Sequence, residues 1–302
     1  MTALPAQDAT VTLSVAHCLD EIDLDPLRRA HTAYIVVDVI RATTTLAVMF
    51  ERGARRALVA RDVESARRVR VSLPEAIVAG EVNAVAPADF DHGNSPDEWG
   101  GLDVTGREIL FSTTNGARGL HAAMGGGPVF AGSLRNASAA CEHALAAARR
   151  LTTAQAGGGV TVVCSGLNGQ PAPDDSLCAG WLIQTLQREV AQQGISAALG
   201  PGAQQALDQL AEQHATYADA TGGTDVTGAE DARAWLATAL RVTPAARAVI
   251  EVGLGADIAW CADVDASTAV PQVAGEDISR KLVVLERAPL DGVDFPNSEL
   301  VR

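Results

Sequence analysis

The stretch from Tyr34 to Thr45 constrains the fold more than any other part of the sequence. It opens with a short, apolar, β-branched run, which is typical of a strand buried on both faces. Asp38 and Arg41 follow the run, Thr43 comes next, and residues 46–50 begin an apolar-faced helix. In open α/β sheets, ligands bind just beyond the carboxyl ends of the strands. The stretch therefore predicts a strand-to-helix turn that carries charged groups where a binding site is expected.

The polar residues of this turn allow two interpretations. Asp38 could hold a divalent metal ion, Arg41 could bind a phosphate or carboxylate through two hydrogen bonds, and Thr43 could bind an oxyanion at the helix start. Alternatively, Asp38 and Arg41 form a structural ion pair, and Thr43 only caps the helix.

Strands, polar loops and helices alternate along the chain as far as residue 191, and this predicts an α/β protein with a three-layer α/β/α fold and a largely parallel sheet. Beyond residue 191 the pattern weakens, and we expect a C-terminal α+β portion. We accordingly divide the chain into a core at 1–192, which carries most strand-end motifs, and a portion at 193–302 that completes the fold. The predicted strands are 11–17, 57–60, 76–79, 109–112, 129–131, 160–164, 257–262 and 282–285. The predicted helices are 43–52, 62–71, 137–150, 176–191, 231–241 and 244–252, with a polar excursion at 195–230.

Charge and cysteine content exclude several classes of function. The net charge of −14 over 302 residues argues against nucleic acid and anionic membranes as partners, because phosphate groups require a positive face. The five cysteines are odd in number and lack a CxxC spacing, which favours reduced thiols over disulfides or a zinc site. No basic-then-apolar leader is present, and no apolar run approaches the roughly 20 residues of a membrane span. We therefore expect a cytoplasmic protein.

Five predicted strand ends carry polar residues. If the strands are parallel, these ends lie along one edge of the sheet and form a single cleft. Such a set suits metal-assisted handling of a small phosphorylated acid, because Mg²⁺ prefers about two carboxylates plus water, while arginines and helix N-termini hold anionic oxygens. The polar ends are Asp38 with Arg41, Glu81, Thr114 with Asn115, Arg135 with Asn136, and Asp174 with Asp175.

Each of these groups also has an ordinary structural interpretation. Asn94 and Asn115 are common turn residues, and acids such as Asp174 and Asp175 favour a helix start in any case. The signatures of dinucleotide-binding, P-loop and nucleophile-elbow enzymes do not occur at strand ends.

Six blocks together resemble one family, the 2-phosphosulfolactate phosphatases, in order and spacing. The blocks are VVDVIRATTT (36–45), AGEVNA (79–84), FDHGNSP (90–96), TTNGARG (113–119), GSLRNASA (132–139) and VCSGLNGQPAPDDSLCAG (163–180). The sequence departs from the family pattern at three places. Val82 to Ala84 replace Arg-Asn-Gly, Asp174-Asp175 replaces Glu-Asp, and Ala245 to Ala248 replace His-Gly-Arg-Arg.

The resemblance implies an α/β/α fold and a Mg²⁺-dependent acid phosphatase, a phosphoric monoester hydrolase that acts on phosphate esters of small 2-hydroxy acids. The activity that names the family converts 2-phosphosulfolactate to 3-sulfolactate on the route to coenzyme M. Position by position, the resemblance singles out Asp38, Arg41, Thr43, Glu81, Asp91, Asn94, Thr114, Asn115, Asn136 and Asp175.

Our hypothesis gives these residues roles. Asp38 and Arg41 are catalytic, and Asp38, Glu81 and Asp175 bind Mg²⁺. The residues assigned to the small anionic phosphate-ester substrate are Thr43, Asp91, Asn94, Thr114, Asn115, Arg135 and Asn136, with Arg247 as another candidate for its second anionic group. A different phosphotransferase and a non-catalytic binder of phosphorylated acids stay open, and a homodimer is expected only as the commonest assembly.

Overall fold

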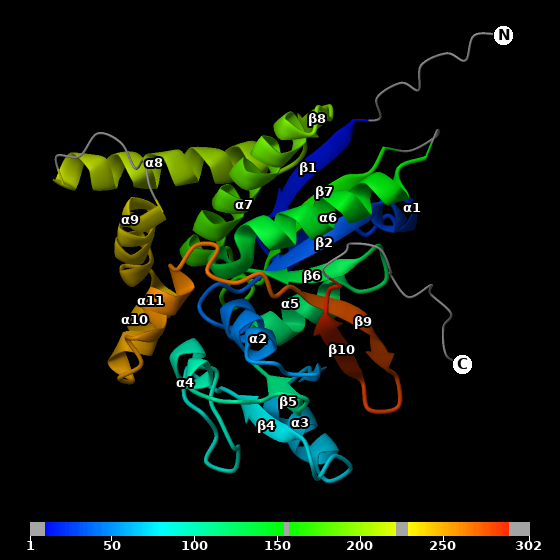
Figure 1. Cartoon of the computed structure of the whole chain (residues 1–302), viewed down its shortest axis with the longest axis vertical. Coiled ribbons are helices and arrows are strands. Elements are labelled where there is room, and N and C mark those ends of the chain that lie inside the picture. The colour runs from blue at the N-terminus through cyan, green and yellow to red at the C-terminus, as the bar shows by residue number, and fades with distance from the viewer. Residues whose placement is uncertain (1–9, 154–156, 222–228, 290–302) are drawn as a thin grey trace.

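The computed structural model describes residues 10–153, 157–221 and 229–289 and shows one ten-stranded sheet with helices on both faces (Figure 1). The strands are β1 (Val11–Ala16), β2 (Thr32–Val37), β3 (Arg56–Ala60), β4 (Ile77–Gly80), β5 (Glu108–Ser112), β6 (Val129–Gly132), β7 (Gly159–Cys164), β8 (Ala197–Leu199), β9 (Pro271–Asp277) and β10 (Leu282–Arg287). The α-helices are α1 (Pro26–Ala30), α2 (Ala42–Glu51), α3 (Val63–Arg70), α4 (Pro96–Gly100), α5 (Gly116–Ala123), α6 (Ala137–Leu151), α7 (Pro173–Gln192), α8 (Ala203–Thr221), α9 (Ala229–Arg241), α10 (Pro244–Glu251) and α11 (Asp257–Cys261). Two short 3₁₀ helices are η1 (Leu19–Glu21) and η2 (Leu134–Asn136).

The sheet consists of two parallel blocks joined by an antiparallel hairpin. Its strand order is β4-β5-β3-β10-β9-β6-β2-β7-β1-β8. Strands β9 and β10 pair antiparallel with each other, with β6 on one side and with β3 on the other. Strands β3, β5 and β4 therefore run opposite to β6, β2, β7 and β1. The expectation of a largely parallel α/β sheet is confirmed, although the hairpin reverses the direction of the smaller block. The polar residues that follow β2, β4, β5 and β7 come together despite this reversal.

Alternating side chains of β2 build the three layers. Ala33, Ile35 and Val37 point into a core formed with α6 and α7. Tyr34 and Val36 point the other way, into a core formed with α2 and α5. This two-sided burial is why the run is apolar throughout rather than alternating. In Figure 1, α6 and α7 lie along β1, β7 and β2.

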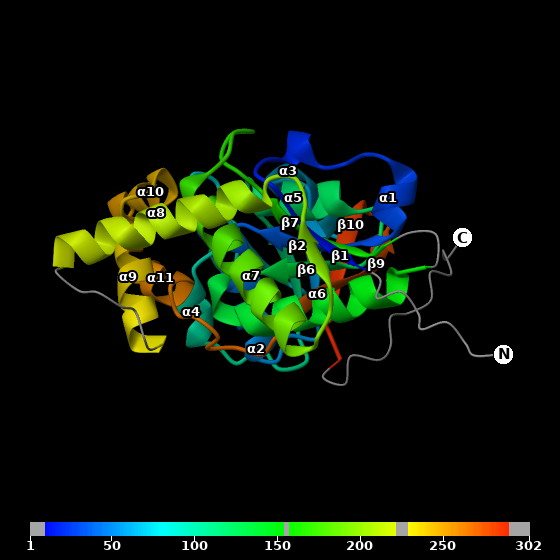
Figure 2. The same cartoon turned by 90° about the horizontal axis from the view of Figure 1, so that it is seen from above.

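The core around α2 and α5 also unites the two blocks of the sheet. Val59 of β3 and Phe111 of β5 pack in the same cluster as Val36 of β2. Helix α3 covers the opposite face of the smaller block, where Ala66 meets Leu58. Both blocks thus share α2 as a common support. Helix α8 lies against α7 and extends beyond the other helices (Figure 2).

The predicted strands and helices up to residue 191, the helices at 231–241 and 244–252, and the strand at 282–285 are confirmed. The predicted strand at 257–262 is wrong: these residues form α11. Strand β9 was not predicted, and residues 222–228 of the polar excursion lie outside the described part of the chain. Within the described residues, none of the helices has the length and apolar character that crossing a membrane requires.

Candidate active site

Asp38 follows β2 directly and is fixed by the first turn of α2. Its backbone carbonyl accepts hydrogen bonds from the amide of Thr43 at 3.0 Å and from the hydroxyl of Thr43 at 3.0 Å. Its carboxylate Oδ1 accepts from the amide of Ala42 at 3.3 Å. Thr43 therefore orients Asp38 and is itself fully buried.

The turn between β5 and α5 joins Asp38 to Glu81, which follows the edge strand β4. The amide of Thr114 donates to Glu81 Oε1 at 2.7 Å, and the amide of Gly116 donates to the carboxylate of Asp38. The second Glu81 oxygen accepts from the amide of Ala84 at 2.9 Å. The ends of β2 and β4 thus meet although the two strands belong to oppositely directed blocks. A side chain at Gly116 would place a Cβ 2.9 Å from Asp38 Oδ2, so this turn needs glycine there.

Two further acids enter from the first turn of α7, beyond β7. Both Asp175 oxygens are occupied by backbone donors, Oδ1 by Val39 and Oδ2 by Gly166, each at 3.0 Å. Asp174 is 3% exposed, and its Oδ1 is buried without any hydrogen-bond partner. We call Asp38, Glu81, Asp174 and Asp175 the acid group.

Burial and mutual repulsion disfavour negative charge on Asp38, Asp174 and Asp175. Burial, with a contribution from the Glu81 charge, raises the pKa of Asp38 to about 6. Burial, together with the charge of Asp38, raises the pKa of Asp174 to about 7. Burial and the neighbouring charges of Asp174 and Asp38 raise the pKa of Asp175 well above its ordinary value. A bound cation would strongly stabilise the ionised form of these buried carboxyl groups.

Arg41 adjoins the acid group but is held by structural partners. Its Nη1 donates to Asp257 Oδ2 at 2.7 Å, and its Nη2 donates to the carbonyl of Ala84 at 2.7 Å. The other carboxylate oxygen of Asp257, Oδ1, accepts a hydrogen bond from the hydroxyl of Ser95 at 2.6 Å. The pair of Arg41 and Asp257 ties α2 to α11 in the protein interior, so a structural ion pair does form, but with Asp257 and not with Asp38.

The structure brings only some of the other predicted residues to this region. Thr114 is exposed and Asn115 half-buried, and both stand on the turn that holds Asp38 and Glu81. Asn94 is buried beside the start of α4 with its Oδ1 unpartnered. Asp91 lies on the flank of β4, where it accepts from the Val78 amide at 2.8 Å and pairs with Arg70.

Arg135 and Asn136 make structural contacts around η2 instead of pointing to the acid group. Arg135 pairs with Glu51 at 3.0 Å and with Asp263 at 3.1 Å, and it lies over the ring of Trp260. Asn136 is fully buried; its Oδ1 caps η2, and its amide nitrogen donates to the carbonyls of Ala131 and Ala269. Neither side chain is directed to the acid group by these bonds. Arg247 lies exposed on α10.

The acid group offers oxygen ligands to a metal ion. In the described part of the chain, no three His, Cys, Asp or Glu side chains converge into a ready-made metal site. Mg²⁺ does not need such a cage, because it keeps several waters and binds through one or two carboxylates plus substrate phosphates. Asp38 and the unpartnered Asp174 oxygen provide that donor set, whereas both oxygens of the predicted ligand Asp175 already accept backbone hydrogen bonds.

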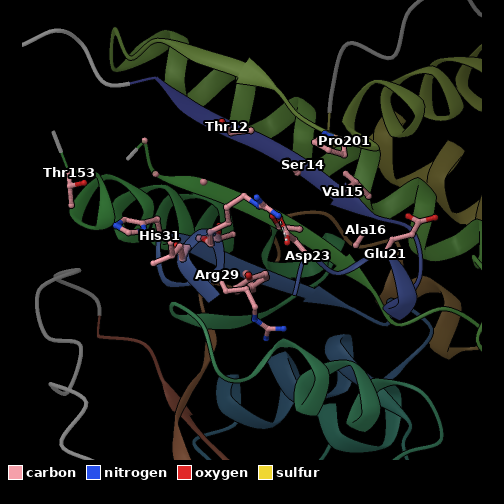
Figure 3. Close-up of a pocket in the computed structure, with 18 residues that line it drawn as sticks. Thr12, Ser14, Val15, Ala16, Glu21, Asp23, Arg29, His31, Thr153 and Pro201 are labelled. Carbon is pink, nitrogen blue, oxygen red and sulfur yellow. Dashed lines mark hydrogen bonds and ion pairs between the residues drawn. The ribbon is translucent and has the colours of Figure 1, made fainter. Parts of the chain in front are cut away.

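A large cavity of about 1030 Å³ lies elsewhere, over the face of β1, β7 and β2 beside α1 (Figure 3). Thr12, Ser14 and Arg29 line it, together with Ala16 and Glu21. None of the four acids lines this cavity.

An α/β sheet with acids gathered at its strand ends is the architecture of enzymes that act on small ligands. Comparison with known proteins gives the family. The chain matches the 2-phosphosulpholactate phosphatase family over residues 20–276. A protein of Thermus thermophilus named probable 2-phosphosulfolactate phosphatase is 36% identical over 259 residues, which are 83% of this chain and 94% of the relative. A protein of Deinococcus radiodurans with the same name is 37% identical over 166 residues, 55% of this chain and 66% of the relative.

The chain belongs to the 2-phosphosulpholactate phosphatase family. It is thus an enzyme of the phosphoric monoester hydrolase class.

Sequence reasoning missed two residues of this region. The sequence places Asp174 among the polar strand ends, but the resemblance singles out its neighbour Asp175 as the ligand. Asp257 was read as part of a strand and given no role. An acid followed by a short apolar run fits a strand or a buried helix equally well, so no local signal revealed its pairing with Arg41.

Proposed function

We propose that this protein is a Mg²⁺-dependent phosphatase that releases phosphate from an ester of a small 2-hydroxy acid. The names of its relatives make 2-phosphosulfolactate the first candidate, with 3-sulfolactate and phosphate as products. One observation supports the proposed metal dependence: Asp174 is buried close to Asp38, and one of its carboxylate oxygens has no hydrogen-bond partner. This activity would supply sulfolactate in the cytoplasm for the route to coenzyme M.

In this proposal, Asp38 and Asp174 hold Mg²⁺, and Asp175 and Glu81 shape the site around them. A bound Mg²⁺ would neutralise the phosphoryl oxygens as charge develops on them. The chain's own contribution is positioning. Backbone amides of Val39 and Gly166 fix Asp175, and the 113–116 turn fixes both Asp38 and Glu81.

The ester would lie against the exposed side of the 113–116 turn. There Thr114 and Asn115 offer neutral hydrogen-bond donors to the phosphoryl oxygens. Arg41 donates one hydrogen bond to Asp257 and another to the carbonyl of Ala84. Its guanidinium adds positive charge close to Asp38. The overall reaction breaks the bond between phosphorus and the ester oxygen, water supplies the new phosphate oxygen, and the released hydroxyl takes a proton.

The test is phosphate release by the purified protein from 2-phosphosulfolactate, 2-phospholactate and 2-phosphoglycolate, each with Mg²⁺ and with a chelator. We expect release that requires Mg²⁺, with 2-phosphosulfolactate the best of the three. Binding of the esters without release would assign the non-catalytic alternative. Release that is unchanged by the chelator would contradict the metal dependence and leave the phosphatase activity standing.

A further inference from the structure

His17 is a buried histidine that the site described above does not use. It follows β1 directly and is 2% exposed. Its backbone amide donates to Glu21 Oε2 at 2.8 Å, its ring Nδ1 lies 3.3 Å from the hydroxyl of Ser176, and its Nε2 lies 3.1 Å from the carbonyl of Gly202. The backbone of His17 is thus tied to η1, and its imidazole bridges the start of α7 and the turn before α8.

The partners of His17 determine where its proton lies. The carbonyl of Gly202 can only accept, so Nε2 carries the hydrogen and donates it. The other ring nitrogen, Nδ1, is then an acceptor, and the hydroxyl of Ser176 donates to it. A direct hydrogen bond of defined direction therefore connects β1 to the first turn of α7.

That first turn carries two members of the acid group. Asp174 and Asp175 immediately precede Ser176 in the sequence. The residue that caps α7, Ala172, provides no side-chain hydrogen bond. Asp175 is anchored by Val39 and Gly166, whereas Asp174 depends on the position of the turn itself.

We propose that His17 is a positioning residue: through Ser176 it holds the first turn of α7 so that Asp174 stays directed toward the metal ion. The inference rests on the function proposed above, because it concerns the metal site of that function. Residues that orient metal ligands without touching the metal change metal affinity typically 10–100-fold when they are replaced.

The experiment measures Mn²⁺ binding by the loss of the free-ion electron paramagnetic resonance signal, together with the thermal midpoint of the metal-free protein. Ser176→Ala removes the hydroxyl that His17 accepts. His17→Gln keeps a donor near the position of Nε2 but removes the acceptor at Nδ1, whereas His17→Asn places an amide oxygen near Nδ1 and keeps that acceptor. Thr185→Val is the matched control, because it removes another buried hydroxyl of α7 about 14 Å along the helix.

We expect Ser176→Ala and His17→Gln each to weaken Mn²⁺ binding about tenfold. The double variant should be no weaker than either single one, because both changes break the same link. His17→Asn should bind within about threefold of the wild type, and Thr185→Val should bind like the wild type.

Two results would overturn the inference. If both variants bind Mn²⁺ like the control while their thermal midpoints fall, His17 only stabilises the fold. If the wild type itself binds no Mn²⁺, the metal dependence of the proposed function fails as well. The wild-type measurement therefore separates the two failures.

Discussion

The acid group makes an unusual prediction for the metal-free protein: its contribution to the free energy of unfolding grows as the pH falls from 7 to 5. Asp174 has an ordinary pKa of 3.8, which burial and the charge of Asp38 raise to about 7 in the folded protein. Between these values the folded protein holds a proton that the unfolded chain releases. Stability is therefore highest below the unfolded pKa and is lost as the pH rises through the folded pKa. Asp38, raised to about 6, acts in the same direction.

The size of the effect follows from proton linkage. A group that is protonated in the folded state and ionised in the unfolded state changes the free energy of unfolding by about 1.4 kcal/mol per pH unit. For Asp174 this amounts to about 2 kcal/mol between pH 5 and pH 7. Asp174→Asn replaces the acid with a neutral amide of the same shape. We expect this variant to be more stable than the wild type at pH 7 and to depend less on pH.

The assay is urea unfolding followed by tryptophan fluorescence at pH 5, 6 and 7 with a chelator present. The control is Asp208→Asn, which removes an exposed carboxylate on α8 and changes the net charge by the same amount. Its pH dependence should match that of the wild type. If Asp174→Asn and the wild type respond to pH in parallel, Asp174 does not hold a proton in the folded state and the reasoning fails.

Three further predictions concern single residues around the site. Ala84→Gly should raise the free energy of unfolding by about 0.5 to 1 kcal/mol, because Ala84 has a φ of +67° that favours glycine; a loss in chemical denaturation would contradict this. Asp257→Ala should lower it by about 3 to 5 kcal/mol by leaving the Arg41 charge buried without its partner, and a loss below 1 kcal/mol in the same assay would refute the role of the pair. Arg135→Ala should cost about 1 to 3 kcal/mol of stability while the KM for the ester stays within about twofold. A large rise in KM at unchanged stability would instead place Arg135 at the substrate.

Much of the fold follows from local patterns in the sequence. The apolar run of β2, the Asp62 cap of α3 and the strand–loop–helix alternation are each readable within a few residues. The direction of the smaller block is not readable in this way. It depends on the β9–β10 hairpin, which comes more than 150 residues after β5 and inserts between β3 and β6. Only long-range pairing decides this.

The candidate site shows the same division. The turn at Asp38 and the acids of α7 could be predicted because charged residues stand at strand ends. The ion-pair partners of the arginines could not be predicted, because these partners lie far away in the chain. Arg41 meets Asp257, and Arg135 meets Glu51 and Asp263. The choice between Asp174 and Asp175 required knowledge of which carboxylate oxygens the backbone already occupies.

The most direct test of the account is the turnover of 2-phosphosulfolactate by Asp174→Asn at saturating Mg²⁺, followed by phosphorus NMR beside the wild type and Asp208→Asn. We expect Asp174→Asn to lose at least about 100-fold in kcat while remaining folded, because it lacks a carboxylate that would hold the metal ion. Asp208→Asn should turn over like the wild type. Wild-type turnover by the Asp174→Asn variant would show that the acid group is not the site of the chemistry.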